Sequence, residues 1–255
     1  MKNLLFELCA ESLEAARAAE FGGADRIELC SELSKGGVTP AIDLATAVIE
    51  ALTIPVHVLI RPRDGDFVFS KQEFGLMERQ IKQARQAGAA GVAIGVLLPD
   101  GRVDVERSRK LVELGRPMRV TFHRAFDEAT ELDEALEAVI QTGADCLLTS
   151  GGAADVLAGA DRIARLHMRA GARLEIMAGG GLQLANLVEV VRRTGVSSLH
   201  GSLTRNAYGD ERNLAHSTNG RFVSSDAALE AKVRELVRLL RQEVQIRESA
   251  TSRAQ

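Results

Sequence analysis

Aromatic residues are scarce in this sequence, which has no Trp, one Tyr and 8 Phe among 255 residues. Proteins that bind single-stranded nucleic acids stack the bases on aromatic side chains within a basic groove. Lys and Arg number 32 against 35 Asp and Glu, a formal net charge of -3, and no basic stripe stands out. We therefore expect no nucleic-acid partner.

Long apolar runs are also missing. No stretch approaches the about 18 apolar residues that a membrane-spanning helix needs. The first residues, Met1–Glu7, contain too short an apolar run for a signal peptide. The three cysteines are widely spaced and odd in number, which argues against a disulfide framework. We expect a reduced, cytoplasmic protein without a membrane segment.

A loose internal repeat is the strongest signal of organisation. Helix-like runs end in glycine and pass directly into short apolar strands at Gly23, Gly88, Gly143 and Gly195. Glycine suits the left-handed position just after a helix, so each of these residues marks a turn from helix to strand. Successive marks are separated by the length of about two βα units, which indicates roughly eight units in the chain.

The alternation of strands and helices supports that number. Strands are expected at about residues 4–9, 24–30, 55–61, 90–96, 118–124, 144–150, 173–178 and 196–201. Helices are expected at about residues 11–21, 40–51, 71–87, 104–114, 131–142, 153–170, 183–193 and 226–246. This pattern predicts an α/β protein with a single (β/α)₈ TIM barrel over residues 1–247 and a frayed tail over 248–255. A doubly wound open sheet is the alternative, but no G-x-G-x-x-G follows the first strand.

Local signals mark where helices begin. Ser70 with Glu73 three residues later makes a capping box. Thr39 is expected to cap a helix that starts with Pro40, and Thr130 is expected to cap in a similar way.

The connection over residues 203–225 is long and polar. A loop of this length in a compact domain is typical of a lid or binding element, with disorder as the alternative.

Charged residues gather where the predicted strands end. Because side chains alternate along a strand, residues two apart share a face. The faces predicted to point into the barrel carry Glu7, Cys9, Arg26, Glu28, Cys30, His57, Leu59, Arg61, Thr121, His123, His200 and Ser202. Charges inside a barrel are costly unless they are paired, so a self-neutralising plug of ion pairs is one interpretation. The other is a functional site, which the position at the carboxyl ends of the strands favours.

Glycine-rich turns add to this prediction. Gly179, Gly180 and Gly181 follow the seventh strand, and His200-Gly201-Ser202 ends the eighth. Glycine lets the backbone approach an anion, and barrels of this type commonly bind phosphate there. Tight turns without a ligand are the alternative. Ser150 after the sixth strand would add a polar wall or mark a simple turn.

Two cysteines end neighbouring strands. Cys9 and Cys30 would lie on strands about 4.8 Å apart and point the same way. Two thiolates so placed suit a soft ion such as Cu(I), whereas two buried apolar cysteines are the commoner outcome.

Several motifs together resemble the CutC family, named for copper homeostasis, over about residues 4–245. The segments that carry the resemblance are RIELC at 26–30, KGGVTP at 35–40, IRPRDGDF at 60–67, FHRAFD at 122–127, LTSG at 148–151 and MAGGG at 177–181. The resemblance implies a (β/α)₈ barrel. It also implies copper, as Cu(I), on Cys9 and Cys30.

Two functional hypotheses follow. The resemblance implies a metal-handling protein that binds Cu(I). The residues themselves favour an isomerase- or lyase-like enzyme on a small phosphorylated or carboxylate substrate. In that hypothesis the catalytic candidates are Glu7, Glu28, His123 and Asp127. The ligand-binding candidates are Arg61, Arg63, Arg124, Ser150, Gly179, Gly180, Gly181, His200, Gly201 and Ser202.

Other roles are weaker on the same residues. No lysine at a predicted strand end suits a Schiff base, which argues against that route. A barrel kept only as an oligomeric scaffold would not explain so many charges at one mouth. Barrels of this kind often pair, so we expect a homodimer or a higher homo-oligomer.

Overall fold

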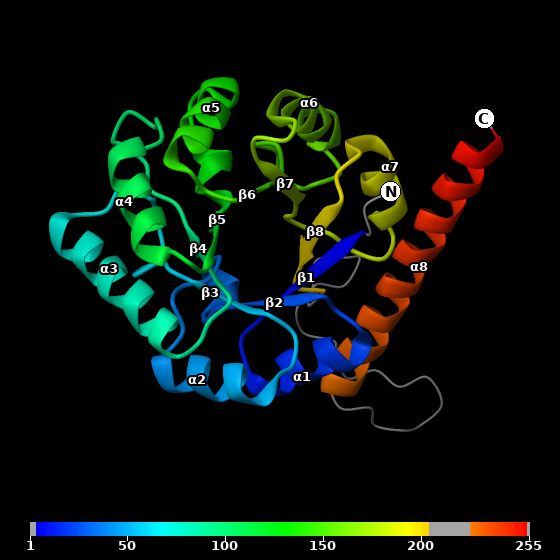
Figure 1. The fold of residues 1–255 in the computed structure, drawn as a ribbon, viewed down its shortest axis with the longest axis horizontal. Coiled ribbons are helices and arrows are strands. Elements are labelled where there is room, and N and C mark those ends of the chain that lie inside the picture. Colours follow the sequence, from blue (N-terminus) through cyan, green and yellow to red (C-terminus); the bar gives the residue numbers. More distant parts are fainter. Residues whose placement is uncertain (1–3, 204–224, 254–255) are drawn as a thin grey trace.

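A closed barrel of parallel strands, ringed by helices, forms the molecule (Figure 1). The structure, a computed structural model, describes residues 4–203 and 225–253. Within those ranges the strands are β1 (Leu5–Ala10), β2 (Arg26–Leu29), β3 (Val56–Leu59), β4 (Gly91–Ile94), β5 (Arg119–Phe122), β6 (Cys146–Thr149), β7 (Glu175–Ala178) and β8 (Ser198–Gly201). The α-helices are α1 (Leu13–Gly22), α2 (Ile42–Ala51), α3 (Lys71–Gln86), α4 (Val105–Gly115), α5 (Leu132–Thr142), α6 (Ala160–Ala170), α7 (Leu187–Thr194) and α8 (Ser225–Arg253). Short 3₁₀ helices, η1 (Leu33–Lys35) and η2 (Arg124–Glu128), follow β2 and β5.

The strands pair in sequence order from β1 to β8, and β8 pairs with β1 to close the barrel. The predicted (β/α)₈ barrel is therefore confirmed. In a parallel barrel every strand presents its carboxyl end at the same mouth, so the residues that follow the strands meet there.

The main apolar core lies between the strands and the helices. Ile27, Ile60 and Phe122 point outward from the barrel and pack in one cluster with helix residues such as Met77. The outward faces predicted from strand alternation are confirmed. Because this layer supplies the large apolar burial, the inner faces of the strands can carry polar side chains.

The capping box at the start of α3 is confirmed. The Ser70 hydroxyl accepts from the Glu73 backbone N–H, and the Glu73 carboxylate accepts from the Ser70 backbone N–H at 2.7 Å. Ser70 and Glu73 belong to the same turn of the chain, so their spacing in the sequence is enough to predict these two hydrogen bonds.

The two predicted threonine caps are wrong. Helix α2 begins at Ile42, and the Thr39 hydroxyl instead accepts from the Arg61 backbone N–H at 2.8 Å. Helix α5 begins at Leu132, and the Thr130 hydroxyl donates to the Asp100 carbonyl at 2.9 Å. Each hydroxyl joins two loops that are distant in sequence, and no local pattern reveals such a partner.

Two helices on the β6–β8 side begin later than predicted, because the glycine-rich loops take up the residues before them. Helix α6 begins at Ala160 rather than 153, and the Val156 N–H before it donates to the Gly180 carbonyl at 2.7 Å. Helix α7 begins at Leu187 rather than 183, and the Gln183 backbone N–H donates to the Asn186 side-chain oxygen at 2.8 Å.

Helix α8 closes the ring by packing beside α1 and α7 (Figure 1). It continues to Arg253, beyond the predicted end at residue 246. The sequence predicts a lid over residues 203–225, and residues 204–224 of that segment lie outside the described part of the chain. Among the described helices, none is both long enough and apolar enough to cross a membrane.

The contact of α1 with α8 depends on a glycine. A Cβ atom at Gly22 would lie 2.6 Å from the Cβ of Val233 and 2.9 Å from the Glu230 carbonyl oxygen. At Gly75, on α3, an added Cβ would meet only the end of the Arg79 side chain at 3.7 Å.

We therefore expect opposite effects from one substitution at these two sites. Gly22→Ala should lower the free energy of unfolding by about 1–3 kcal/mol because it overpacks the α1–α8 contact. Gly75→Ala should raise it by about 0.5–1 kcal/mol through helix propensity. Urea denaturation of both variants measures the two values. Equal stability of the two variants would contradict this account of the contact.

Candidate functional site at the carboxyl mouth of the barrel

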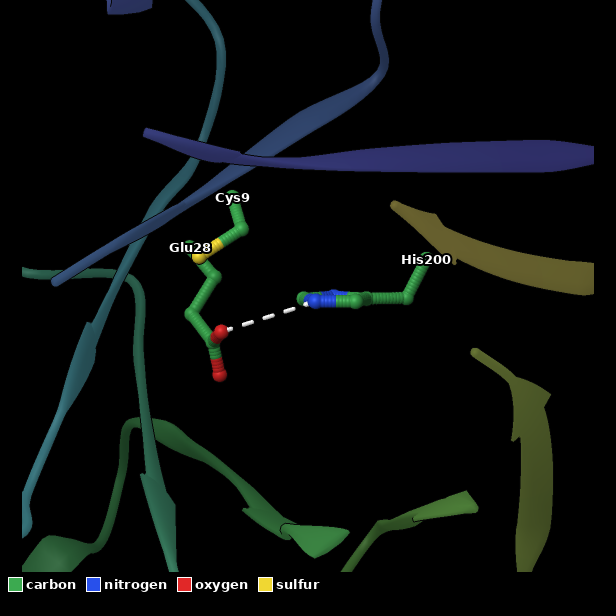
Figure 2. A group of neighbouring side chains, drawn as sticks. All are labelled: Cys9, Glu28 and His200. Atoms are coloured by element: carbon green, nitrogen blue, oxygen red, sulfur yellow. Dashed lines mark ion pairs between the residues drawn. The ribbon is translucent and has the colours of Figure 1, made fainter. Parts of the chain in front are cut away.

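Three side chains converge inside the barrel from neighbouring strands (Figure 2). Cys9 lies on β1, Glu28 on β2 and His200 on β8, and β1 pairs with both of the other strands. One potential ligand atom from each residue lies within 4.8 Å of the other two. The His200 Nε2 and Glu28 Oε2 atoms are 3.7 Å apart. The sulfur, the carboxylate and the ring thus share one buried space.

Glu7 precedes Cys9 by two residues on β1, lies in register with Arg26 and His200, and holds His200 in place. Its Oε2 accepts from the Arg26 Nε at 2.5 Å, and its Oε1 accepts from the His200 Nδ1 at 2.8 Å. His57 Nδ1 is 3.7 Å from the same carboxylate. Burial opposes the ionisation of Glu7, but Arg26 and the His200 hydrogen bond outweigh it, so the pKa of Glu7 falls well below its ordinary value. Glu7 is an ionised orienting group for His200.

Glu28 and His200 have pKa values that are shifted in the same direction. Burial foremost, and then the charge of Glu7, raise the pKa of the Glu28 carboxyl. Burial alone would lower the pKa of His200, but the Glu28 and Glu7 carboxylates raise it. Shifted carboxyl and imidazole groups side by side in a cavity are typical of a site for proton transfer.

The opposite wall of the mouth is cationic and includes His123. The His123 Nδ1 accepts from the Ala125 backbone N–H at 3.1 Å, so the ring proton is on Nε2. Burial, and then the neighbouring Arg61, lower the pKa of His123 to about 3. Its buried Nε2 has no hydrogen-bond partner among residues 4–203 and 225–253. His123 is therefore a neutral N–H donor, which suits the binding of a ligand better than the catalytic role expected from the sequence.

Arg61 is held rigidly beside His123. Its guanidinium donates to the carbonyl oxygens of Gly37 at 2.9 Å and Gly65 at 2.6 Å, and it stacks over the Phe67 ring at 4.6 Å. The Phe67 ring also lies 5.1 Å from that of His123. The Arg61 Nε, like the His123 Nε2, is buried and has no partner in the described ranges. Two fixed N–H groups thus lack acceptors on the same wall.

Arg124 is held on this wall by Asp127 and Ser150. Its Nε donates to the Asp127 carboxylate at 2.8 Å, and its Nη2 donates to the Ser150 hydroxyl at 3.2 Å. Asp127 also accepts from the backbone N–H groups of Ser150 and Gly152. With its oxygens engaged in this way, Asp127 organises the loops after β5 and β6 and is not placed as a proton donor or acceptor.

Arg63 lies outside this arrangement. It donates to Glu73 at 2.6 Å and to Asp66 at 2.8 Å, and it stacks over Phe69. These contacts tie the loop after β3 to the first turn of α3. Although both Arg61 and Arg63 are ligand-binding candidates in the sequence, only Arg61 lines the cavity.

A cavity of about 210 Å³ separates the two walls. The predicted site residues that line it are Cys9, Glu28, Arg61, His123, Arg124, Gly180, Gly181, His200, Gly201 and Ser202. The predicted site residues outside its lining are Glu7, Cys30, Arg63, Asp127, Ser150 and Gly179. Gly180 and Gly181 have φ angles of +98° and +78°, and a Cβ at Gly180 would lie 3.0 Å from the Arg124 Cζ. Glycine is needed there for the loop to approach the cationic wall.

The two cysteines lie where the strand alternation predicts. Their sulfur atoms are 3.2 Å apart, Cys30 is fully buried, and Cys9 reaches the cavity. The hydrogen bond between them, together with burial and the charge of Glu28, raises the pKa of the Cys9 thiol well above its ordinary value. Cys9 is therefore protonated at neutral pH unless another cation replaces the proton.

Some residues that line the cavity are not among the site residues predicted from the sequence. Leu33, Gly36 and Gly37 line it from the segment after β2, which Ser31 and Val38 close by an antiparallel bridge. Phe67 lines it from the loop after β3. The motifs that contain Gly36, Gly37 and Phe67 were visible, but these residues have no ionisable group to mark them as part of a site.

Comparison with known proteins identifies relatives of this chain. The CutC family model matches residues 4–205. A CutC family protein of Chromobacterium violaceum is 44% identical over 198 residues, which cover 78% of this chain and 80% of that protein. One from Vibrio vulnificus is 43% identical over 203 residues, with coverage of 78% and 81%.

Solved structures give the same picture. The CutC protein of Streptococcus agalactiae, whose name links it to copper homeostasis, superposes with a TM-score of 0.74 at 29% identity, covering 78% of this chain and 98% of that one. N-(5'-phosphoribosyl)anthranilate isomerase of Pyrococcus furiosus gives a TM-score of 0.56 at 17% identity, covering 94% and 100%. At that identity the likeness concerns the fold alone.

The buried neutral histidines make stability depend on pH. Burial lowers the pKa of His57 to about 4 and that of His123 to about 3, against about 6.5 in an unfolded chain. Below pH 6.5 these two histidines bind protons in the unfolded state but stay neutral in the folded state. The free energy of unfolding should therefore fall as the pH falls.

We expect His123→Asn to flatten this dependence between pH 6 and pH 5 by up to about 1.4 kcal/mol per pH unit. Urea unfolding of both proteins across that range measures the slopes. Parallel curves would show that His123 is already protonated in the folded protein.

Proposed function

The chain belongs to the CutC family, and from that membership and the geometry of the mouth we propose that it is a barrel enzyme acting on a small anionic substrate. One observation carries the proposal. The side chains of His123 and Arg61, whose buried N–H groups lack acceptors in the described part of the chain, line the cavity that Glu28 and His200 line on its other side.

The cationic wall would bind the anionic group of the substrate. A carboxylate or phosphate oxygen accepts hydrogen bonds, so it would satisfy the two donors, whose burial without a partner is costly. Arg124 adds positive charge, and the loop at Gly180 and Gly181 brings the backbone close to the same space. A cavity of about 210 Å³ suits a small metabolite.

The wall opposite would carry out the reaction. With the anion bound to Arg61 and His123, the rest of the substrate lies against Glu28 and His200. Their side chains are 3.7 Å apart and both pKa values are raised, so the pair can hold a proton and exchange it with the substrate. This favours a proton-transfer reaction of the isomerase or lyase class. No lysine lines the cavity as the described residues form it, in keeping with the absence of a Schiff-base route.

Copper binding is the second candidate function. The name of the S. agalactiae protein links the family to copper homeostasis, and Cys9 and Cys30 place two sulfur atoms 3.2 Å apart. Thiolates are the ligands that Cu(I) prefers, so this pair fits the ion in chemistry. Because the pKa of Cys9 is raised, Cu(I) would have to displace its proton, and affinity would weaken as the pH falls.

Anion binding is tested by variants of two arginines that are close in sequence. Arg61→Gln and His123→Phe should each weaken the binding of inorganic phosphate or malonate roughly 10- to 100-fold, the effect of one or two hydrogen bonds to a charged group. Arg63→Gln should leave affinity unchanged, because Arg63 faces α3. Isothermal titration calorimetry measures the constants. Equal losses in Arg61→Gln and Arg63→Gln would indicate a general effect of charge and contradict the assigned wall.

Copper binding is tested separately by competition against a strong Cu(I) chelator. We expect Cys9→Ser/Cys30→Ser to lose any tight one-to-one binding that the wild type shows, whereas Cys146→Ser, on β6, should retain it. Binding that the double variant retains would remove this pair as the copper site.

A further inference from the structure

The group drawn in Figure 2 combines three kinds of metal ligand in one place. Cys9 offers a sulfur, Glu28 an oxygen and His200 a ring nitrogen, all three residues are buried, and their ligand atoms lie within 4.8 Å of one another. Bonds of about 2.0–2.3 Å in a tetrahedral zinc site place ligand atoms roughly 3.3–3.8 Å apart. The 3.7 Å between His200 Nε2 and Glu28 Oε2 already falls in that range.

The orientation of His200 supports a metal ligand. Its Nδ1 donates to Glu7 at 2.8 Å, which in the neutral ring leaves the lone pair on Nε2, directed toward Glu28. Histidines that bind metals commonly donate their other nitrogen to a carboxylate, which fixes both tautomer and ring orientation. Glu7 is itself anchored by Arg26 at 2.5 Å, so the support extends to a second layer.

The charge balance favours a divalent ion. A Cys9 thiolate and a Glu28 carboxylate together carry two negative charges, while Glu7 is already neutralised by Arg26. A divalent cation would make this buried group neutral, and a monovalent one would leave a charge in the barrel. Sulfur, nitrogen and oxygen ligands together match the preferences of zinc, and binding would release the thiol proton.

The position of the group indicates a reactive rather than a structural site. All three residues line the cavity, and so do Arg61 and His123. Three protein ligands with one position open to a cavity are the arrangement of catalytic zinc sites, whereas structural sites have four protein ligands.

We propose that Cys9, Glu28 and His200 hold a divalent transition-metal ion, with zinc the best match, whose open position faces the anion-binding wall. Glu7 is a positioning residue that orients His200. In the metal-loaded protein Glu28 is a ligand, and a substrate oxygen bound at the open position would be polarised by the ion. The inference uses the cavity of the proposed function but not its assignment of a proton-transfer role to Glu28 and His200.

The test begins with Co²⁺ added to metal-free protein as a spectroscopic substitute for zinc. We expect a cobalt–thiolate charge-transfer band and the visible absorption of a tetrahedral ion, both lost in Cys9→Ser. They should persist in Cys30→Ser, because the Cys30 sulfur lies outside the group, and in Cys146→Ser. Absence of the band from the wild type overturns the proposal, and so does its loss in Cys30→Ser together with Cys9→Ser, which would place the ion on the cysteine pair.

Competition titration with a chromophoric Zn²⁺ chelator measures the affinities. His200→Gln should weaken zinc binding by more than 100-fold, and Glu7→Gln by about 10- to 100-fold, the usual effect of losing a group that orients a ligand. Circular dichroism identifies any variant that fails to fold. If one fails, it is set aside, and the Co²⁺ spectra of the wild type and Cys30→Ser test the proposal. Unchanged zinc affinity in folded His200→Gln would overturn the proposal.

Phosphate titration of the metal-free protein separates this proposal from the proposed function. Phosphate binding without zinc binding would reject the metal site alone. Zinc binding with no response to phosphate or malonate would reject the anion site alone.

Discussion

The buried ion pair between Glu7 and Arg26 is the constraint on which the inside of this barrel depends. A charged carboxylate in a barrel interior is costly unless charges and hydrogen bonds surround it. Here the partners come from three other strands: Arg26 from β2, His57 from β3 and His200 from β8. The pair therefore joins the strands on either side of β1 and sets the direction of the His200 ring.

The contacts of Glu7 also orient the group of Cys9, Glu28 and His200. Because the His200 Nδ1 is hydrogen-bonded to Glu7, its Nε2 faces Glu28 and the Cys9 sulfur. Across the cavity a second network, through Asp127 and Ser150, holds Arg124, while backbone carbonyls hold Arg61. The mouth thus has an acidic, sulfur-bearing wall and a cationic wall, each positioned by its own network of hydrogen bonds and ion pairs. Such rigid support is what a site needs to bind or react selectively.

Much of this arrangement was predictable from the sequence, for reasons that are local. Strand alternation is a covalent property of extended chains, so it correctly placed Cys9, Glu28 and His200 on inward faces and Ile27 and Phe122 on outward ones. The same rule could not separate Arg61 from Arg63. Both follow β3 within a single motif, and only the fold of the loop turns one guanidinium to the cavity and the other to Glu73.

By itself the sequence determined the eight βα units, the barrel and the mouth at which polar residues gather, because hydrophobic periodicity and glycine placement act over a few residues. Only the tertiary structure decided which of those residues act together. The His123 tautomer depends on the path of the backbone after β5, the ionised state of Glu7 depends on its distance from Arg26, and the group of Cys9, Glu28 and His200 depends on closure of the barrel between β8 and β1. These are contacts between residues distant in the chain, and their energies depend on distance and burial, which no local pattern specifies.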